Sequence, residues 1–191
     1  MIYEKSLQEG KLGLPDDWKM ATVIPIYKKG SKNDAGNYRP VSLTSVPYKV
    51  LESVMKDAMV DYLETTGFYN DCQHGFVKGK STLTNLFETL ESWTRILDEG
   101  LGIDVIYLDY RKAFDTVPRK RLIDELRGSG INGSLLRWID QFLLDRKMRV
   151  QVNVSLSDWF KVFSGVPQGS VLCRCCFSSM FKIFRSGLQT V

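Results

Sequence analysis

The sequence lacks the features that mark several common protein classes. It has no run of about 18 apolar residues, the length a membrane-spanning helix needs, so we expect no membrane partner. Its opening residues, MIYEKSLQEG, lack the apolar core of a secretory signal. Three of the four cysteines crowd into CRCC at 173–176, and with the single His74 they lack the paired spacing of a disulfide framework or a zinc site. We therefore expect an intracellular protein, nuclear or cytoplasmic and not secreted, with reduced thiols.

The composition indicates a folded chain with a mild basic excess. The 191 residues are 43% hydrophobic, enough for one substantial core. The net charge is +4 and the pI is about 8.8, which favours contact with a polyanion. Residues 51–100 carry 9 acidic and 4 basic side chains, whereas the segments on either side are net basic. This pattern predicts either a groove lined with positive charge or ordinary solvated helix faces, and both interpretations stay open.

Apolar periodicity predicts a mixed α+β chain. The expected strands are 20–27, 103–108, 148–154 and 159–163, the last two paired with each other, and the expected helices are 45–64, 82–99, 119–127 and 134–145. Helix 45–64 should bury one stripe, made of Val50, Leu51, Val54, Met55, Ala58, Met59 and Leu63. Helix 82–99 should begin at a Ser81 cap and bury an apolar face of Leu83, Leu86, Phe87, Leu90, Trp93 and Leu97.

The stretch IDVIYLDYRKAFDTVP at 103–118 is the centre of the expected site. Its apolar run predicts a buried strand that ends at Asp109, and open α/β sheets place ligands at that end of a strand. A carboxylate there requires a cation, although for a lone aspartate at a strand end a cap of the following turn is the more common explanation. Asp115, in the turn expected at 112–117, should cap or bridge locally.

Two loops are candidates for phosphate or nucleotide contact. Lys28 and Lys29 open a mobile basic loop that leads to Arg39, which suits phosphate binding, although an ordinary hairpin tip has the same composition. Loop 164–170, SGVPQGS, has two glycines that allow close backbone approach to a flat ligand, and Gln168 supplies a donor and an acceptor.

The segment QHGFVKGKST at 73–82 does not form a phosphate loop. Gly75 stands one position too close to Gly79-Lys80-Ser81, and no hydrophobic strand precedes it. We expect His74 to be a structural hydrogen-bonding residue at this bend.

Five segments together resemble the reverse transcriptase domain of non-LTR (LINE-type) retrotransposons. They are LPDDWKMATVIPIYKKG, NYRPVSLTS, QHGFVKGKST, YLDYRKAFDTV and SGVPQGSVL, in the order of the family and with similar spacing. The resemblance implies an α+β right-hand polymerase with fingers and an incomplete palm. It divides the chain into a lead-in at 1–13, fingers and partial palm at 14–172, and a divergent tail at 173–191.

The resemblance also implies roles for individual residues. Asp109 and the main-chain carbonyl of Tyr110 would bind Mg²⁺, and Phe114 would be a steric gate beneath the incoming sugar. Ala113, Gly169 and Gln168 would contact the nucleotide, Gln168 also the template. Lys28, Lys29 and Arg39 would hold the triphosphate. The implied partners are an RNA template, a DNA primer and deoxynucleoside triphosphates.

The chain departs from the family after Leu172. Residues 173–191 contain no acid, so the paired aspartates of the family are missing there. We expect an RNA-directed DNA polymerase domain that is inactive in this truncated chain unless another chain completes the palm. The alternative is a non-catalytic nucleic-acid-binding fragment that uses the basic loop and helix 119–127. An exposed apolar face is also expected, made of Val171, Leu172, Phe177, Phe181 and Phe184.

Overall fold

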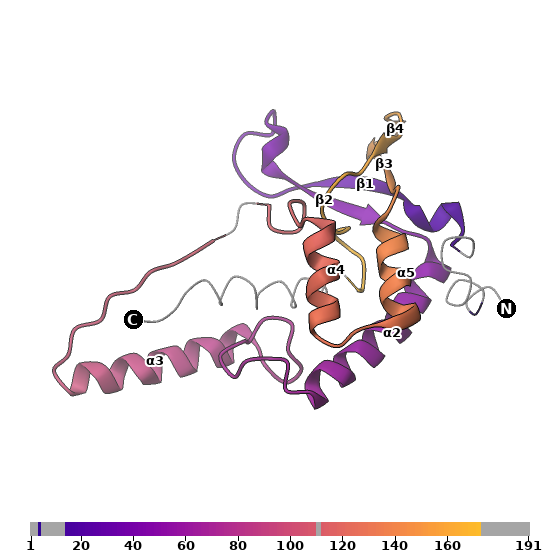
Figure 1. Ribbon diagram of the computed structural model, residues 1–191. Helices are drawn as coiled ribbons and strands as arrows, with labels where there is room; N and C mark the ends of the chain where they lie inside the picture. The colour runs from indigo at the N-terminus through magenta and orange to yellow at the C-terminus, as the bar shows by residue number, and fades with distance from the viewer. Residues whose placement is uncertain (1–3, 5–13, 110–111, 173–191) are drawn as a thin grey trace.

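The computed structural model of the protein describes residues 4, 14–109 and 112–172, and it has the expected mixed α+β composition. Its elements are η2 (Asp16–Lys19), β1 (Met20–Tyr27), η3 (Ala35–Asn37), β2 (Tyr38–Leu43), α2 (Val46–Thr65), α3 (Thr82–Asp98), α4 (Arg119–Gly128), α5 (Gly133–Leu143), β3 (Lys147–Val152), β4 (Ser155–Leu156) and β5 (Phe160–Lys161). α4 and α5 stand beside each other next to α2, and α3 extends away from this group (Figure 1). Among the described helices, none combines the length and apolarity that crossing a membrane requires.

In the described part of the chain, five strands form one sheet. Its order is β2-β1-β3-β4, with β5 also paired to β3, which confirms the expected pairing of segments 148–154 and 159–163. β1 runs antiparallel to β2 and parallel to β3. Pro25 and Pro40 face each other in the β1–β2 pair, beyond Val23, where the pairing of β1 with β3 ends. Neither proline therefore interrupts the middle of the sheet.

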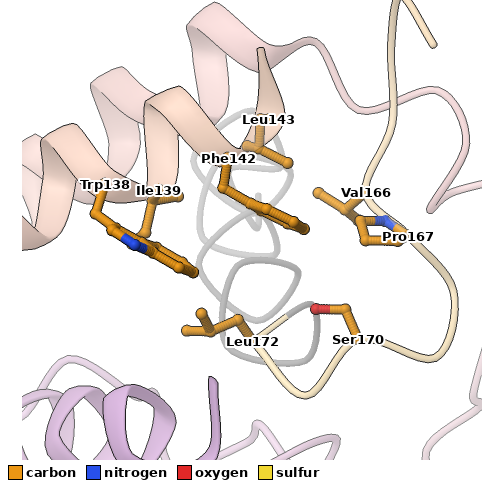
Figure 2. A pocket seen from close by; sticks show the side chains of 8 residues that line it. All are labelled: Trp138, Ile139, Phe142, Leu143, Val166, Pro167, Ser170 and Leu172. Atoms are coloured by element: carbon orange, nitrogen blue, oxygen red, sulfur yellow. The ribbon is translucent and has the colours of Figure 1, made fainter. Parts of the chain in front are cut away.

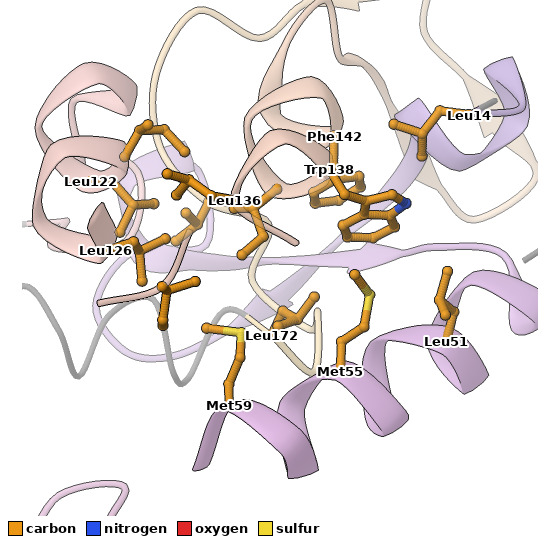
Figure 3. Packing of buried hydrophobic residues seen from close by; sticks show 14 of the residues in the cluster. Leu14, Leu51, Met55, Met59, Leu122, Leu126, Leu136, Trp138, Phe142 and Leu172 are labelled. Atoms are coloured by element: carbon orange, nitrogen blue, oxygen red, sulfur yellow. The ribbon is translucent and has the colours of Figure 1, made fainter. Parts of the chain in front are cut away.

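One apolar cluster joins α2, α4 and α5 (Figure 3). The Tyr48 ring on α2 stacks on two rings of α5, with centroids 5.8 Å from Trp138 and 4.6 Å from Phe142. Leu126 contributes from α4 and is fully buried. Leu172 also lies in this cluster with 4% of its surface exposed, so its expected place on an exposed face is wrong.

The other residues predicted for this exposed face are Val171, Phe177, Phe181 and Phe184. Val171 is partly buried, because the chain at this point already packs against α2 and α5. Phe177, Phe181 and Phe184 lie outside the described residues.

The buried stripe predicted for α2 is half right. Leu51, Met55, Met59 and Leu63 are buried as expected. Val50, Val54 and Ala58 are exposed, and their places in the core are taken by Tyr48 and Glu52. The positions 48, 52, 55, 59 and 63 follow the 3–4 spacing of one helix face, which an apolar count alone did not identify because Glu52 is charged.

The predicted burial of the α3 face is wrong. α3 forms as expected, but the structure gives it no buried residue. Leu83, Leu86, Phe87, Leu90 and Leu97 are each at least 45% exposed, because α3 projects from the cluster (Figure 1). Periodicity correctly identified the helix and its apolar side, but no described element of the structure buries that side.

The strand predicted at 103–108 is absent. These residues have no strand pairing, and Ile106 and Tyr107 are 83% and 84% exposed. The segment connects α3 to the turn before α4 along an extended path (Figure 1). A strand requires a neighbour that accepts and donates its hydrogen bonds, so β-branched composition alone did not suffice here.

Candidate functional site

Loop 164–170 is attached to the turn at 112–117 by main-chain hydrogen bonds. The Val166 amide donates to the Phe114 carbonyl and the Gly165 amide donates to the Val117 carbonyl, both at 2.9 Å. Gly165 has a φ of +82°, and a Cβ there would lie 2.6 Å from the carbonyl oxygen of Asp115. Glycine is therefore required for the two backbones to touch.

Gln168 links the same loop to β2. Its carbonyl oxygen accepts a hydrogen bond from the Ser42 amide at 2.8 Å, and its Nε2 donates to Asp115 Oδ1 at 3.0 Å. Asp115 was expected to cap or bridge locally, and this is wrong, because its partner lies 53 positions further along the chain. Gly169 follows at a φ of +108°, and an added Cβ would lie 2.9 Å from the Ser42 carbonyl oxygen.

Two further site candidates lie beside this junction. Ala113 and Phe114 are partly buried and pack against the core cluster. The structure therefore brings Ala113, Phe114, Gln168 and Gly169 into one region. Their contacts with a nucleotide stay predictions.

None of the hydrogen bonds described for this junction involves Asp109. It is exposed and lies in a segment, 101–109, that has no regular secondary structure, so its predicted position at the end of a buried strand is wrong. Tyr110 lies outside the described residues. Among the residues that the structure describes, no three His, Cys, Asp or Glu side chains form a cluster that could hold a metal ion. The described donor set therefore does not fit a pair of Mg²⁺ ions, which require carboxylates from more than one side.

The basic loop between β1 and β2 is tied together by its own polar groups. The Tyr27 hydroxyl donates to the Gly30 carbonyl at 2.6 Å, and the Tyr38 hydroxyl donates to the Lys32 carbonyl at 2.8 Å. Asn37 Nδ2 donates to the Ser31 carbonyl at 3.0 Å. These bonds hold the hairpin tip in one shape.

The three predicted phosphate-binding cations lie on this hairpin. Lys28, Lys29 and Arg39 are all exposed, and Arg39 stands opposite Ile26 in the β1–β2 register. Because these hydrogen bonds already hold the hairpin, binding of a phosphate to its exposed cations would not carry the entropic cost of ordering the loop first.

A buried carboxylate that the sequence interpretation missed lies behind loop 164–170. Glu52 of α2 is 0% exposed. Its Oε1 accepts hydrogen bonds from the Tyr48 hydroxyl at 2.5 Å and from the Ser170 hydroxyl, and its Oε2 accepts one from the Val171 amide at 3.1 Å. The available signal was a glutamate on the buried face of α2, which is rare unless the carboxylate has partners.

Burial raises the pKa values of this pair. The pKa of Glu52 is raised by loss of solvent, although the hydrogen bonds from Ser170, Tyr48 and the Val171 amide act in the opposite direction. The pKa of Tyr48 is raised well above its ordinary value, first by burial and then by the nearby Glu52. Three donors to one buried carboxylate are the arrangement that makes such a group tolerable in a core.

A small apolar pocket adjoins this network (Figure 2). Trp138 and Phe142 line it from α5, and Val166, Ser170 and Leu172 line it from the loop and the residues after it. These side chains belong largely to the buried cluster, so we assign the pocket to packing between α5 and the loop.

The bend at 73–82 has a structural role, as predicted. His74 is buried, with Nδ1 2.9 Å from Thr84 Oγ1 and Nε2 3.0 Å from Glu88 Oε2. The Ser81 hydroxyl accepts a hydrogen bond from the Thr84 amide, which confirms the predicted cap of α3. Lys80 donates to the carbonyl of Asp71. The lysine of the rejected phosphate-loop pattern is therefore bonded to the main chain of a residue nine positions earlier.

These contacts define a mixed α+β domain in which a strand, a turn and a glycine-containing loop meet at one glutamine. The chain belongs to the family described as reverse transcriptase (RNA-dependent DNA polymerase), whose model matches residues 26–190. The resemblance drawn from the five sequence segments is thereby confirmed.

Curated relatives come from transposable elements. The chain is 30% identical over 165 residues to a probable RNA-directed DNA polymerase from transposon BS of Drosophila melanogaster, which covers 86% of the chain and 18% of the relative. It is 27% identical over 191 residues to the RNA-directed DNA polymerase from mobile element jockey of the same species, covering 100% of the chain and 20% of the relative. A retrovirus-related Pol polyprotein from the type-1 retrotransposable element R2 of Popillia japonica is 26% identical over 180 residues, 93% of the chain and 24% of the relative. The chain thus spans about a fifth of the length of these relatives.

Proposed function

We propose that residues 14–172 form the fingers and the first part of the palm of a reverse transcriptase, and that they hold RNA template, DNA primer and deoxynucleoside triphosphate. The observation that supports this is the junction at Gln168, where three of the family's five segments meet through Ser42, Asp115 and the loop backbone. Leu14 and Leu172 are both buried in the same cluster, so both ends of this segment belong to one packed unit. The family match continues beyond it to residue 190.

Each site residue has a proposed role in this arrangement. Lys28, Lys29 and Arg39 contact phosphate, because they are exposed cations on one hairpin. Phe114 lies beneath the sugar and rejects a ribonucleotide by steric overlap, since an apolar pocket alone rejects a hydroxyl group weakly.

Three further residues complete the nucleotide contact. Gln168 contacts the template and the incoming nucleotide, and Gly169 and Ala113 line that contact.

We propose that this chain does not carry out nucleotidyl transfer by itself. Asp109 remains the candidate ligand for Mg²⁺, with the carbonyl of Tyr110 beside it. The described residues place no group of three potential ligands around Asp109, so the metal site requires acids from outside the described residues. Bound Mg²⁺ would supply charge stabilisation for phosphoryl transfer.

The basic helix α4 is a weaker candidate for nucleic-acid binding than the hairpin. Arg119 forms an ion pair with Asp140 and Arg127 forms one with Asp124, each at 2.8 Å. These two cations are partly neutralised, whereas Lys28 and Lys29 stand exposed at the hairpin.

The salt dependence of RNA binding tests the proposed role of the hairpin. We expect Lys28→Ala/Lys29→Ala to weaken binding of a single-stranded RNA and to reduce the slope of log K against log salt by about 0.7 for each phosphate that is no longer neutralised. Lys147→Ala/Lys161→Ala is the matched control. The two lysines face each other across β3 and β5, and Lys147 also pairs with Met20, the first residue of β1. They therefore lie at the opposite end of β1 from the hairpin. Equal slopes for both variants would contradict the proposal.

A further inference from the structure

Glu52 reaches from the middle of α2 to the residues that directly follow the Gln168 junction. Ser170 and Val171 are its partners, two and three positions after Gln168. Both partners belong to one stretch of backbone that has no regular secondary structure of its own. The carboxylate therefore adds two hydrogen bonds to the far end of a loop whose own turn is closed by one bond, from the Ser170 amide to the Pro167 carbonyl at 3.1 Å.

The loop has five other hydrogen-bonded attachments. Ser164, Gly165 and Val166 each donate one bond to the turn at 112–117. The Gln168 carbonyl bonds to β2 at Ser42, and the Gln168 side chain bonds to Asp115. Without Glu52, the hydrogen bonds from the loop to other elements would lie only on the side of the sheet and the turn, while Val166 and Leu172 would still pack in the core cluster. Gln168 would then gain freedom to move toward or away from its ligand.

We propose that Glu52 is a positioning residue for Gln168, which it holds in place through the two loop residues that it binds. The inference rests on the proposed contact of Gln168 with template and nucleotide. Glu52 does not itself contact the ligand, because it is fully buried beneath the loop.

The geometry identifies a replacement that should preserve this role. In Glu52→Gln, the amide nitrogen can occupy the Oε1 position and donate to the hydroxyl oxygens of Tyr48 and Ser170. The amide oxygen then occupies the Oε2 position and accepts from the Val171 amide. Glu52→Leu has a similar volume but offers no acceptor, so it removes all three bonds.

Two measurements on the full chain test the inference. The first is amide hydrogen exchange at Val171 and Ser42, with Leu126 of α4 as an internal reference. We expect Glu52→Leu to accelerate exchange at Val171 and Ser42 by about tenfold or more, Glu52→Gln to leave it close to wild type, and Leu126 to change little. Unchanged protection of Val171 and Ser42 in Glu52→Leu would overturn the inference.

The second measurement is the Kd for an RNA template annealed to a DNA primer. We expect Glu52→Leu and Gln168→Ala each to raise the Kd by about tenfold, and the double variant to be no weaker than Gln168→Ala alone. Two outcomes would overturn the inference by showing a general structural role for Glu52. One is a double variant whose increase in Kd is the product of the two single increases. The other is a Glu52→Gln variant that binds as weakly as Glu52→Leu.

The two measurements separate this inference from the proposed function. If exchange responds as expected but Gln168→Ala leaves the Kd unchanged, the attachment by Glu52 is supported and the proposed ligand contact of Gln168 is overturned. If Glu52→Leu does not fold, Ser170→Ala removes one bond from the loop side and should accelerate exchange at Val171 and Ser42 to a smaller extent. No acceleration in Ser170→Ala would then count against the inference.

Discussion

Gly165 is the residue at which a single added methyl group has a clear expected cost. Gly165→Ala places a Cβ 2.6 Å from the Asp115 carbonyl oxygen at a φ of +82°. Gly79→Ala is the matched control, with a φ of +77° and no atom within 4 Å of the new Cβ. We expect the control to lose about 1–2 kcal/mol from backbone strain and Gly165→Ala to lose about 1–3 kcal/mol more from overlap. Urea unfolding followed by circular dichroism measures both, and equal losses would contradict the close approach.

Glu52 should give the chain a measurable pH dependence of stability. Burial raises the pKa of Glu52, so the folded state holds its proton more tightly than the unfolded state does. The contribution of Glu52 to the free energy of unfolding should therefore be greatest below the ordinary pKa of glutamate and should be lost as pH rises through the raised pKa. Glu52→Gln has no such proton, so its stability relative to wild type should increase with pH.

Urea unfolding from about pH 4 to about pH 8, followed by the fluorescence of the buried Trp18 and Trp138, checks this prediction. The other ionisable groups at this site are Tyr48, whose pKa is raised further into the alkaline range, and Arg146, which interacts electrostatically with Tyr48. Neither is expected to change charge in this window. Parallel curves for wild type and variant would contradict the prediction.

At the scale of elements, periodicity located the helices better than it located their partners. The sequence predicted α2, α3, α4 and α5 close to their observed bounds, because apolar spacing and caps are local properties. It misjudged the burial of α3 and the pairing of 103–108, since both depend on which segments lie nearby in space. The exposed Ile106 and Tyr107 show that a strong strand composition does not create a pairing partner.

The exposed face of α3 gives a prediction about stability. Phe87 is 63% exposed, so Phe87→Gln should change the free energy of unfolding by no more than about 0.5 kcal/mol. Leu126 is 0% exposed in α4, so Leu126→Ala should cost about 2–5 kcal/mol. Chemical unfolding of the two variants beside wild type makes the comparison. A large loss in Phe87→Gln would mean that α3 packs more closely in solution than the structure indicates.

At the scale of the whole molecule, the sequence predicted the family and the grouping of several site residues, but not what holds them together. Five short segments in order were enough for the family, because their order and spacing are properties of the chain. The attachment of Gln168 to Asp115 and Ser42, and the buried support from Glu52, depend on long-range packing that no local pattern encodes.

Primer extension with Mg²⁺ and deoxynucleotides tests the proposal that the chain alone lacks nucleotidyl transfer. We expect no extension of a DNA primer on an RNA template, because the described residues place no group of three potential metal ligands around the exposed Asp109 and residues 173–191 contain no acid. Asp109→Ala should then behave as wild type, while an active reverse transcriptase serves as the assay control. Extension by the wild-type chain, abolished in Asp109→Ala, would contradict the proposal. It would mean that this chain supplies further metal ligands without a partner, because a two-metal transfer cannot proceed on one carboxylate.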